Sequence, residues 1–164
     1  MDQGLVLTYS WVRRTRAQVL DFCQGLPLEV YTREHPDFGF GSLRNLHAHV
    51  AECYLWWVGN VGLGNASLAV QGQDIPDVPA MRRLFDQVDA TVEEAFQKFT
   101  RLDEVYEWTH PIRGWRMSVS QRWLLMHPIT HEFHHKGQMM TLARIWGYTM
   151  PPETDTDLVP PTLG

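Results

Sequence analysis

The fold is decided by residues 79–102, PAMRRLFDQVDATVEEAFQKFTRL, in which apolar side chains recur every three or four positions. On a helix such residues share one face, so they form a continuous apolar stripe. The stripe consists of Met81, Leu84, Phe85, Val88, Val92, Ala95, Phe96, Phe99 and Leu102. The opposite face is charged, and we interpret it as solvated. Asp77 is placed to cap this helix and Pro79 lies in its first turn, so the sequence predicts a long amphipathic helix.

Three further segments carry apolar residues at helical spacing. One helix is predicted from about Leu5 to Gln24, before a Gly/Pro-containing stop. Another begins after Ser42, whose hydroxyl can accept from an otherwise unpaired backbone N–H, and weakens at later glycines. The last is predicted to begin at a capping box formed by Ser118 and Gln121 and to run to about Trp146.

The connections complete the predicted architecture. Residues 103–117 favour a short irregular β-hairpin between the third and fourth helices, and the tail from about 150 to 164 is expected to be irregular. Four helices, each with one apolar stripe, must bury those stripes against one another. The sequence therefore predicts an all-α, four-helix bundle that forms a single domain over residues 1–164.

Composition excludes several classes of function. The chain has 164 residues and a formal net charge of -5, and its Lys and Arg residues form no cluster, which argues against nucleic-acid binding. No apolar stretch approaches the roughly 20 residues that span a bilayer, so no membrane partner is expected. The start lacks the features of a signal peptide, and Cys23 and Cys53 form no CxxC pair. We expect a reduced, cytoplasmic protein.

The most informative stretch for chemistry is MHPITHEFHHKGQ, residues 126–138. His131 and His135 are four positions apart, so a helix places both imidazoles on one face, which also carries apolar core positions. Inward-facing imidazoles need a partner, and a transition metal is a natural one. Gln138, one turn on, could fix a ligand or a bound water. The alternative is a set of core or surface histidines with ordinary hydrogen bonds.

A third ligand is expected, because two histidines hold a transition metal weakly. The second predicted helix offers His47 and His49, which point in nearly opposite directions, so only one can face inward. Periodicity slightly favours His47. Cys53, one turn after His49, is a rival ligand, although a small buried apolar role suits it better.

Two segments resemble the DinB/YfiT-like family: SLRNLHAHVAE at residues 42–52 and LLMHPITHEFHHKGQ at residues 124–138. The resemblance extends over the whole length. It implies a four-helix bundle with a three-histidine site for a divalent metal, zinc or nickel, and a homodimer. By motif, the ligands fall on His49, His131 and His135.

The resemblance also implies an enzyme, because the family includes transferases and isomerases that use low-molecular-weight thiols. A metal held by three neutral histidines keeps an open position and can lower the pKa of a bound thiol or water. Glu132 or Gln138 would then steer protons or orient the nucleophile. The expected substrate is a small electrophilic molecule of unknown identity.

Two alternatives stay open. One is a non-enzymatic, metal-binding stress-response protein. The other is a zinc hydrolase, because residues 131–135 match the pattern HExxH, in which Glu132 would polarise a zinc-bound water. No histidine follows His135, and Glu153 is the only glutamate downstream, so the hydrolase pattern lacks an obvious third ligand.

Overall fold

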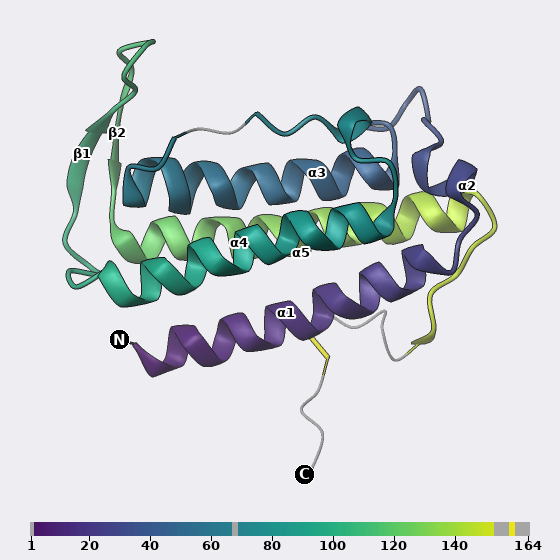
Figure 1. The fold of residues 1–164 in the computed structure, drawn as a ribbon, viewed down its shortest axis with the longest axis horizontal. Coiled ribbons are helices and arrows are strands. Elements are labelled where there is room, and N and C mark those ends of the chain that lie inside the picture. The colour runs from purple at the N-terminus through teal and green to yellow at the C-terminus, as the bar shows by residue number, and fades with distance from the viewer. Residues whose placement is uncertain (1, 67–68, 153–157, 160–164) are drawn as a thin grey trace.

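The computed structural model describes residues 2–66, 69–152 and 158–159 of the chain. Four long helical segments run alongside one another (Figure 1). They are α1 (Gln3–Gln24), α3 (Leu43–Tyr54) continued by η1 (Leu55–Gly62), α4 (Val78–Lys98) and α5 (Gln121–Ile145). Helix α3 packs against α4 and α5, and α1 also contacts both of them. The predicted helical character is confirmed.

Two short elements were not predicted. Helix α2 (Leu28–Thr32) follows Pro27, and the 3₁₀ turn η2 (Gly72–Asp74) lies in the connection before α4. Segments of three to five residues are too short to show a helical period, which explains why the sequence pattern missed them. The described part of the chain thus contains five α-helices rather than four.

The predicted caps of the second and third helices are confirmed. The Ser42 hydroxyl accepts from the backbone N–H of Asn45 at 3.1 Å, and the Asp77 carboxylate accepts from that of Ala80 at 2.8 Å. The π-helical segment η1 continues α3 where glycines were expected to weaken the helix. A Cβ at Gly62 would lie 2.6 Å from the Phe99 ring, so this glycine lets η1 pack closely.

The predicted hairpin is also confirmed. Strand β1 (Tyr106–Thr109) pairs antiparallel with β2 (Arg116–Val119). The predicted start of the last helix at Ser118 is wrong. Ser118 lies in β2 and pairs with Glu107, so it does not cap α5. The N-cap is Ser120, whose hydroxyl accepts from the backbone N–H of Trp123 at 3.2 Å.

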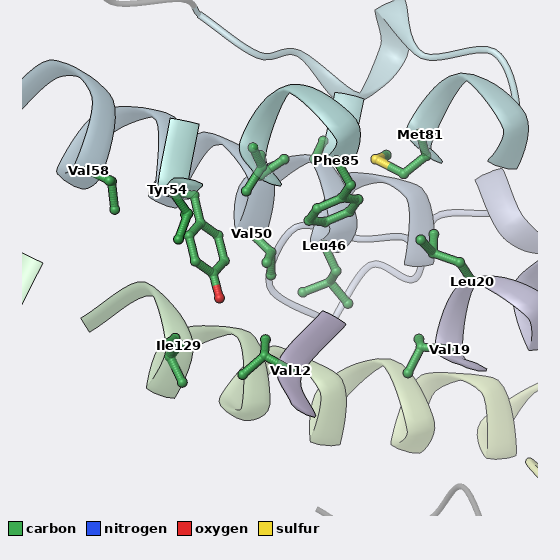
Figure 2. Packing of buried hydrophobic residues seen from close by; sticks show 14 of the residues in the cluster. Val12, Val19, Leu20, Leu46, Val50, Tyr54, Val58, Met81, Phe85 and Ile129 are labelled. Atoms are coloured by element: carbon green, nitrogen blue, oxygen red, sulfur yellow. The ribbon is translucent and has the colours of Figure 1, made fainter. Parts of the chain in front are cut away.

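One cluster of buried hydrophobic residues joins the four long segments (Figure 2). Its fully buried members include Val12 of α1, Leu46 of α3, Met81 of α4 and Leu124 of α5. Helix α5 continues through Pro128. No helix in the described ranges is both long and apolar enough to cross a membrane.

Candidate metal centre

Three histidine side chains from two helices converge where α3 packs against α5. His49 comes from α3, whereas His131 and His135 lie one turn apart on α5. The Nε2 atom of His131 is 2.9 Å from the Nε2 of His49 and 3.0 Å from the Nε2 of His135. The structure thus brings together the three residues predicted as metal ligands, with donor atoms within 4.8 Å of one another.

The spacing of these nitrogen atoms suits a single cation. Histidine nitrogens bind zinc at about 2.0–2.1 Å, so two of them at angles of about 90–110° are separated by roughly 2.9–3.4 Å. The separations of 2.9 Å and 3.0 Å fall within this range. Zinc, nickel, copper and iron all accept neutral imidazole, so the donor set fits a transition-metal ion without selecting one.

The electrostatic environment keeps the three imidazoles neutral. Burial, together with the neighbouring imidazole of His135, lowers the pKa of His49 from 6.5 to about 4. Burial and the surrounding histidines lower the pKa of His131 to about 4, and burial also lowers the pKa of His135. A neutral imidazole has a free lone pair, so at neutral pH the cluster is prepared to bind a cation.

Gln138 sets the orientation of one ligand. Its Oε1 lies 2.6 Å from Nδ1 of His135, and its Nε2 lies 3.2 Å from Nε2 of His134. An amide oxygen can only accept, so Nδ1 of His135 carries the proton and Nε2 keeps its lone pair for a metal. This contact has the geometry expected for the supporting role that the sequence suggested for Gln138.

Phe40 covers the cluster, although no sequence motif indicated it. Its ring stacks on His49 with centroids 4.0 Å apart and an interplanar angle of 21°, and meets His135 edge-on at 5.5 Å. Phe40 has a φ of 63°, a left-handed conformation that is costly for a bulky residue. The strained backbone thus holds an aromatic ring against two candidate ligands.

The DinB family matches residues 1–160, nearly the whole chain. The chain belongs to the DinB family. Its fold is similar to that of a DinB-like protein from Bacillus cereus ATCC 10987, with a TM-score of 0.66 and 21% identity over 92% of this chain and 95% of that chain. No curated protein matches the chain.

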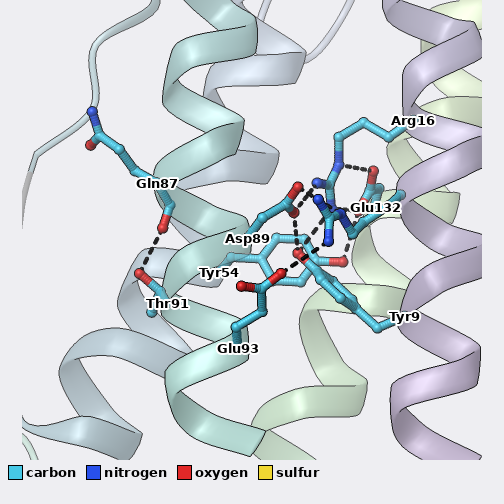
Figure 3. A network of polar contacts seen from close by, with 9 residues as sticks. Tyr9, Arg16, Tyr54, Gln87, Asp89, Thr91, Glu93 and Glu132 are labelled. Carbon is cyan, nitrogen blue, oxygen red and sulfur yellow. Dashed lines mark hydrogen bonds and ion pairs between the residues drawn. The ribbon is translucent and has the colours of Figure 1, made fainter.

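In this DinB-family chain, the Glu132 carboxylate lies in a buried polar network with Arg16 and Tyr54 (Figure 3). This carboxylate accepts from Arg16 at 2.8 Å and 2.9 Å and from the Tyr54 hydroxyl at 2.7 Å. Arg16 also bonds to Asp89 at 2.7 Å. The sequence pattern did not indicate this network, because Arg16 and Glu132 are 116 residues apart in the chain.

The placement of Glu132 bears on the hydrolase alternative. In an HExxH hydrolase the glutamate acts on a zinc-bound water, whereas here both carboxylate oxygens already accept from Arg16, and one also from Tyr54. His49 from α3 completes the group of three possible ligands. Glu153, the only downstream glutamate, lies outside the described residues. The geometry therefore argues against a zinc hydrolase of the HExxH type.

His47, which periodicity slightly favoured as the third ligand, lies in the core. It is 2% exposed, and its Nδ1 lies 3.3 Å from the Tyr31 hydroxyl. Burial lowers its pKa to about 3. The helical period correctly indicated the more buried histidine, but the three-histidine cluster forms beside the core, where His49 points.

Two cavities meet at His49 and Glu52, which line both of them. The first is polar, has a volume of about 270 Å³ and includes Arg44 and Asn45. The second, of about 200 Å³, has mainly aromatic walls. Its other lining residues are Cys53, Trp56, Trp57, His127 and His131. Glu52 was not among the predicted site residues, because a half-exposed helical glutamate carries no sequence signal of its own.

Cys53, the rival ligand, lies in the wall of the aromatic cavity. With His127 and His131 it forms a second group of possible ligands, whose donor atoms lie within 4.8 Å of one another. Burial raises the pKa of its thiol to about 12, so without a metal the sulfur is protonated and a poor donor. The three-nitrogen cluster is the stronger candidate centre in this DinB protein.

Proposed function

We propose that this chain is a divalent-metal-dependent transferase or isomerase, in which a low-molecular-weight thiol attacks a small electrophile. One observation carries the proposal: three neutral imidazoles meet at a point where two cavities join. A structural site is usually closed by four protein ligands, whereas the group formed by His49, His131 and His135 has three members among the described residues. A three-ligand site beside a cavity favours chemistry over a purely structural metal.

The residues around the site have distinct roles in this proposal. A zinc or nickel ion bound by the three histidines would lower the pKa of a thiol or water beside it. Gln138 holds His135 in the tautomer that can bind the ion, and Phe40 fixes the ring of His49. Glu132 acts as a positioning residue, because its bonds to Arg16 and Tyr54 hold α5 in place.

Glu52 is the group best placed to receive the thiol proton. Its carboxylate lies 4.0 Å from Nδ1 of His49 and lines both cavities, and its side chain is 42% exposed. In a transfer, the thiol gives its proton to Glu52, which releases it to solvent. The sulfur then forms a bond to the electrophilic carbon. The leaving group departs with the bonding electron pair. In an isomerisation, the added thiol is itself eliminated afterwards.

The test is turnover by the metal-loaded protein. Protein purified without a histidine tag is loaded with zinc or nickel and incubated with 1-chloro-2,4-dinitrobenzene and either N-acetylcysteine or 2-mercaptoethanol. We expect release of chloride and formation of the thioether above the uncatalysed rate, and loss of this activity in His131→Ala. No turnover with either metal and either thiol would contradict the proposed reaction and favour a non-enzymatic metal-binding protein.

A further inference from the structure

We infer that Cys53, His127 and His131 form a second metal position, about one helical turn from the histidine cluster, which takes a thiophilic ion such as Cd²⁺ or Cu⁺. The ligand atoms of these three residues lie within 4.8 Å of one another. Of the two groups of possible ligands among the described residues, only this one contains a sulfur atom. The inference concerns the choice of metal and does not depend on the proposed reaction.

The second position repeats the first, shifted by four residues along each helix. On α3, Cys53 follows His49 by four positions, and on α5, His127 precedes His131 by four. Four residues are about one turn, and a step forward along one helix matches a step back along the other when the two are antiparallel. The packing of α3 against α5 that assembles the histidine cluster therefore also brings Cys53 to His127 and His131.

The ring of His127 is held in place by its aromatic neighbours. It stacks on Trp123 with centroids 4.7 Å apart and an interplanar angle of 14°, and on His131 at 5.7 Å and 28°. Trp57 meets it edge-on with centroids 5.4 Å apart. A ligand whose side chain is already fixed loses little freedom when it binds an ion, which favours binding at this position.

The aromatic cavity gives an ion access to the second position. Cys53, His127 and His131 all line this cavity, whose volume is about 200 Å³. Among its lining residues in the described ranges, Glu52 is the only one that is charged when the histidines are neutral, and its charge is negative. A carboxylate on the wall attracts a cation, so the electrostatics of the cavity also favour a metal ion there.

The sulfur atom of Cys53 determines which ion prefers this position. Thiolate ligands favour soft ions, whereas imidazole suits zinc, nickel, copper and iron. When an ion binds here, a sulfur–metal bond forms and the thiol proton is released to solvent. The histidine cluster binds an ion without this deprotonation. We therefore expect zinc and nickel at the histidine cluster and a thiophilic ion at Cys53.

The two positions exclude each other, because His131 belongs to both groups of ligands. A neutral imidazole carries a proton on one nitrogen and a free lone pair on the other, so His131 binds one ion at a time. A thiophilic ion that binds at Cys53 should therefore displace zinc from the histidine cluster.

Cadmium binding to the metal-free, reduced protein tests the inference. A cadmium–sulfur bond gives an ultraviolet charge-transfer band, and competition with a chelator gives the dissociation constant. We expect the parent to show the band. Cys53→Ala should lose it and bind cadmium more than about 100-fold more weakly, while its zinc affinity stays within about threefold of the parent. Cys23→Ala, which replaces the other buried cysteine, is the matched control and should change neither affinity.

Substitution of single histidines distinguishes the two positions. His127→Phe keeps a ring beside Trp123 but removes the nitrogen ligand, so cadmium should bind at least about tenfold more weakly. His49→Ala and His135→Ala should lose tight zinc binding but keep both the cadmium band and the parental cadmium affinity. Circular dichroism verifies folding, and His127→Phe still tests the position if Cys53→Ala is unfolded.

Three outcomes would overturn the inference: cadmium binding without the sulfur band, parental cadmium affinity in Cys53→Ala, or weakened cadmium binding in His49→Ala, which would place the ion in the histidine cluster. Dialysis of the zinc-loaded protein against Cd²⁺, followed by elemental analysis, should show that cadmium replaces zinc. Retention of both ions would overturn the sharing of His131. None of these measurements requires turnover, so the inference and the proposed reaction can fail separately.

Discussion

His131 and Glu132 are consecutive residues whose side chains point to different sides of α5. The Nε2 of His131 lies 2.9 Å from that of His49, whereas the Glu132 carboxylate accepts from Arg16 at 2.8 Å and from Tyr54 at 2.7 Å. Successive residues on a helix are about 100° apart, which allows this division. On one side of α5, a buried ion pair joins Glu132 to Arg16 of α1. On the other, the imidazole of His131 lines a cavity.

Removal of any one of the three clustered histidines should abolish tight metal binding. We expect His49→Ala, His131→Ala and His135→Ala each to weaken zinc affinity by more than about 100-fold, because two histidines hold the ion poorly. Competition with a chelator of known affinity measures the change. His134→Ala, an exposed histidine on the same helix, is the control and should stay within a few-fold of the parent.

Gln138 should tune the affinity without supplying a ligand atom. Gln138→Ala removes the acceptor that lies 2.6 Å from Nδ1 of His135, and loss of such a partner typically weakens metal binding by about 10–100-fold. Gln138→Glu keeps an acceptor oxygen and should restore most of the affinity. Equal affinity in Gln138→Ala and the parent would show that the contact does not orient His135.

Loss of the Glu132 carboxylate should affect stability far more than it affects metal binding. Glu132→Ala leaves the buried Arg16 guanidinium without its main partner, and breaking a buried pair costs about 3–5 kcal/mol. Urea unfolding of the metal-free protein measures this loss. Glu94→Ala breaks an exposed pair with Lys98 and should leave the free energy of unfolding nearly unchanged. A Glu132→Ala protein with parental stability would contradict the anchoring role.

Acidification should destabilise the protein partly through His47. Burial lowers the pKa of His47 in the folded state from 6.5 to about 3. Below pH 6.5, His47 is therefore protonated in the unfolded chain while it stays neutral in the folded chain. The free energy of unfolding should therefore fall as pH falls, by about 1.4 kcal/mol per pH unit from this group.

His47→Gln isolates this contribution. Between pH 7 and pH 5, the free energy of unfolding of the parent should fall by about 2 kcal/mol more than that of His47→Gln. Chemical unfolding of the metal-free proteins at several pH values measures it. His134→Gln, at an exposed position, serves as the comparison. Parallel pH profiles for the parent and His47→Gln would show that His47 is protonated in the folded state as readily as in the unfolded chain.

The sequence by itself determined the helices and part of the site. Helical spacing indicated the stripe of α4, the side chains of Ser42 and Asp77 marked two helix starts, and four-residue spacing put His131 and His135 on one face. These features depend on residues close together in the chain, so local patterns report them. The start of α5 was misplaced, because pairing of Ser118 with Glu107 in the hairpin overrode its local capping pattern.

Only the tertiary structure decided which side chains meet across the helices. It paired Glu132 with Arg16, brought Phe40 onto His49 and placed Glu52 between the two cavities. It also brought His49 to His131, as the family resemblance implied and helical periodicity did not. A periodic pattern reports how deeply a residue is buried, but not which distant residue it faces. That choice depends on the rotation and offset of each helix against its neighbours, which packing of the whole chain sets.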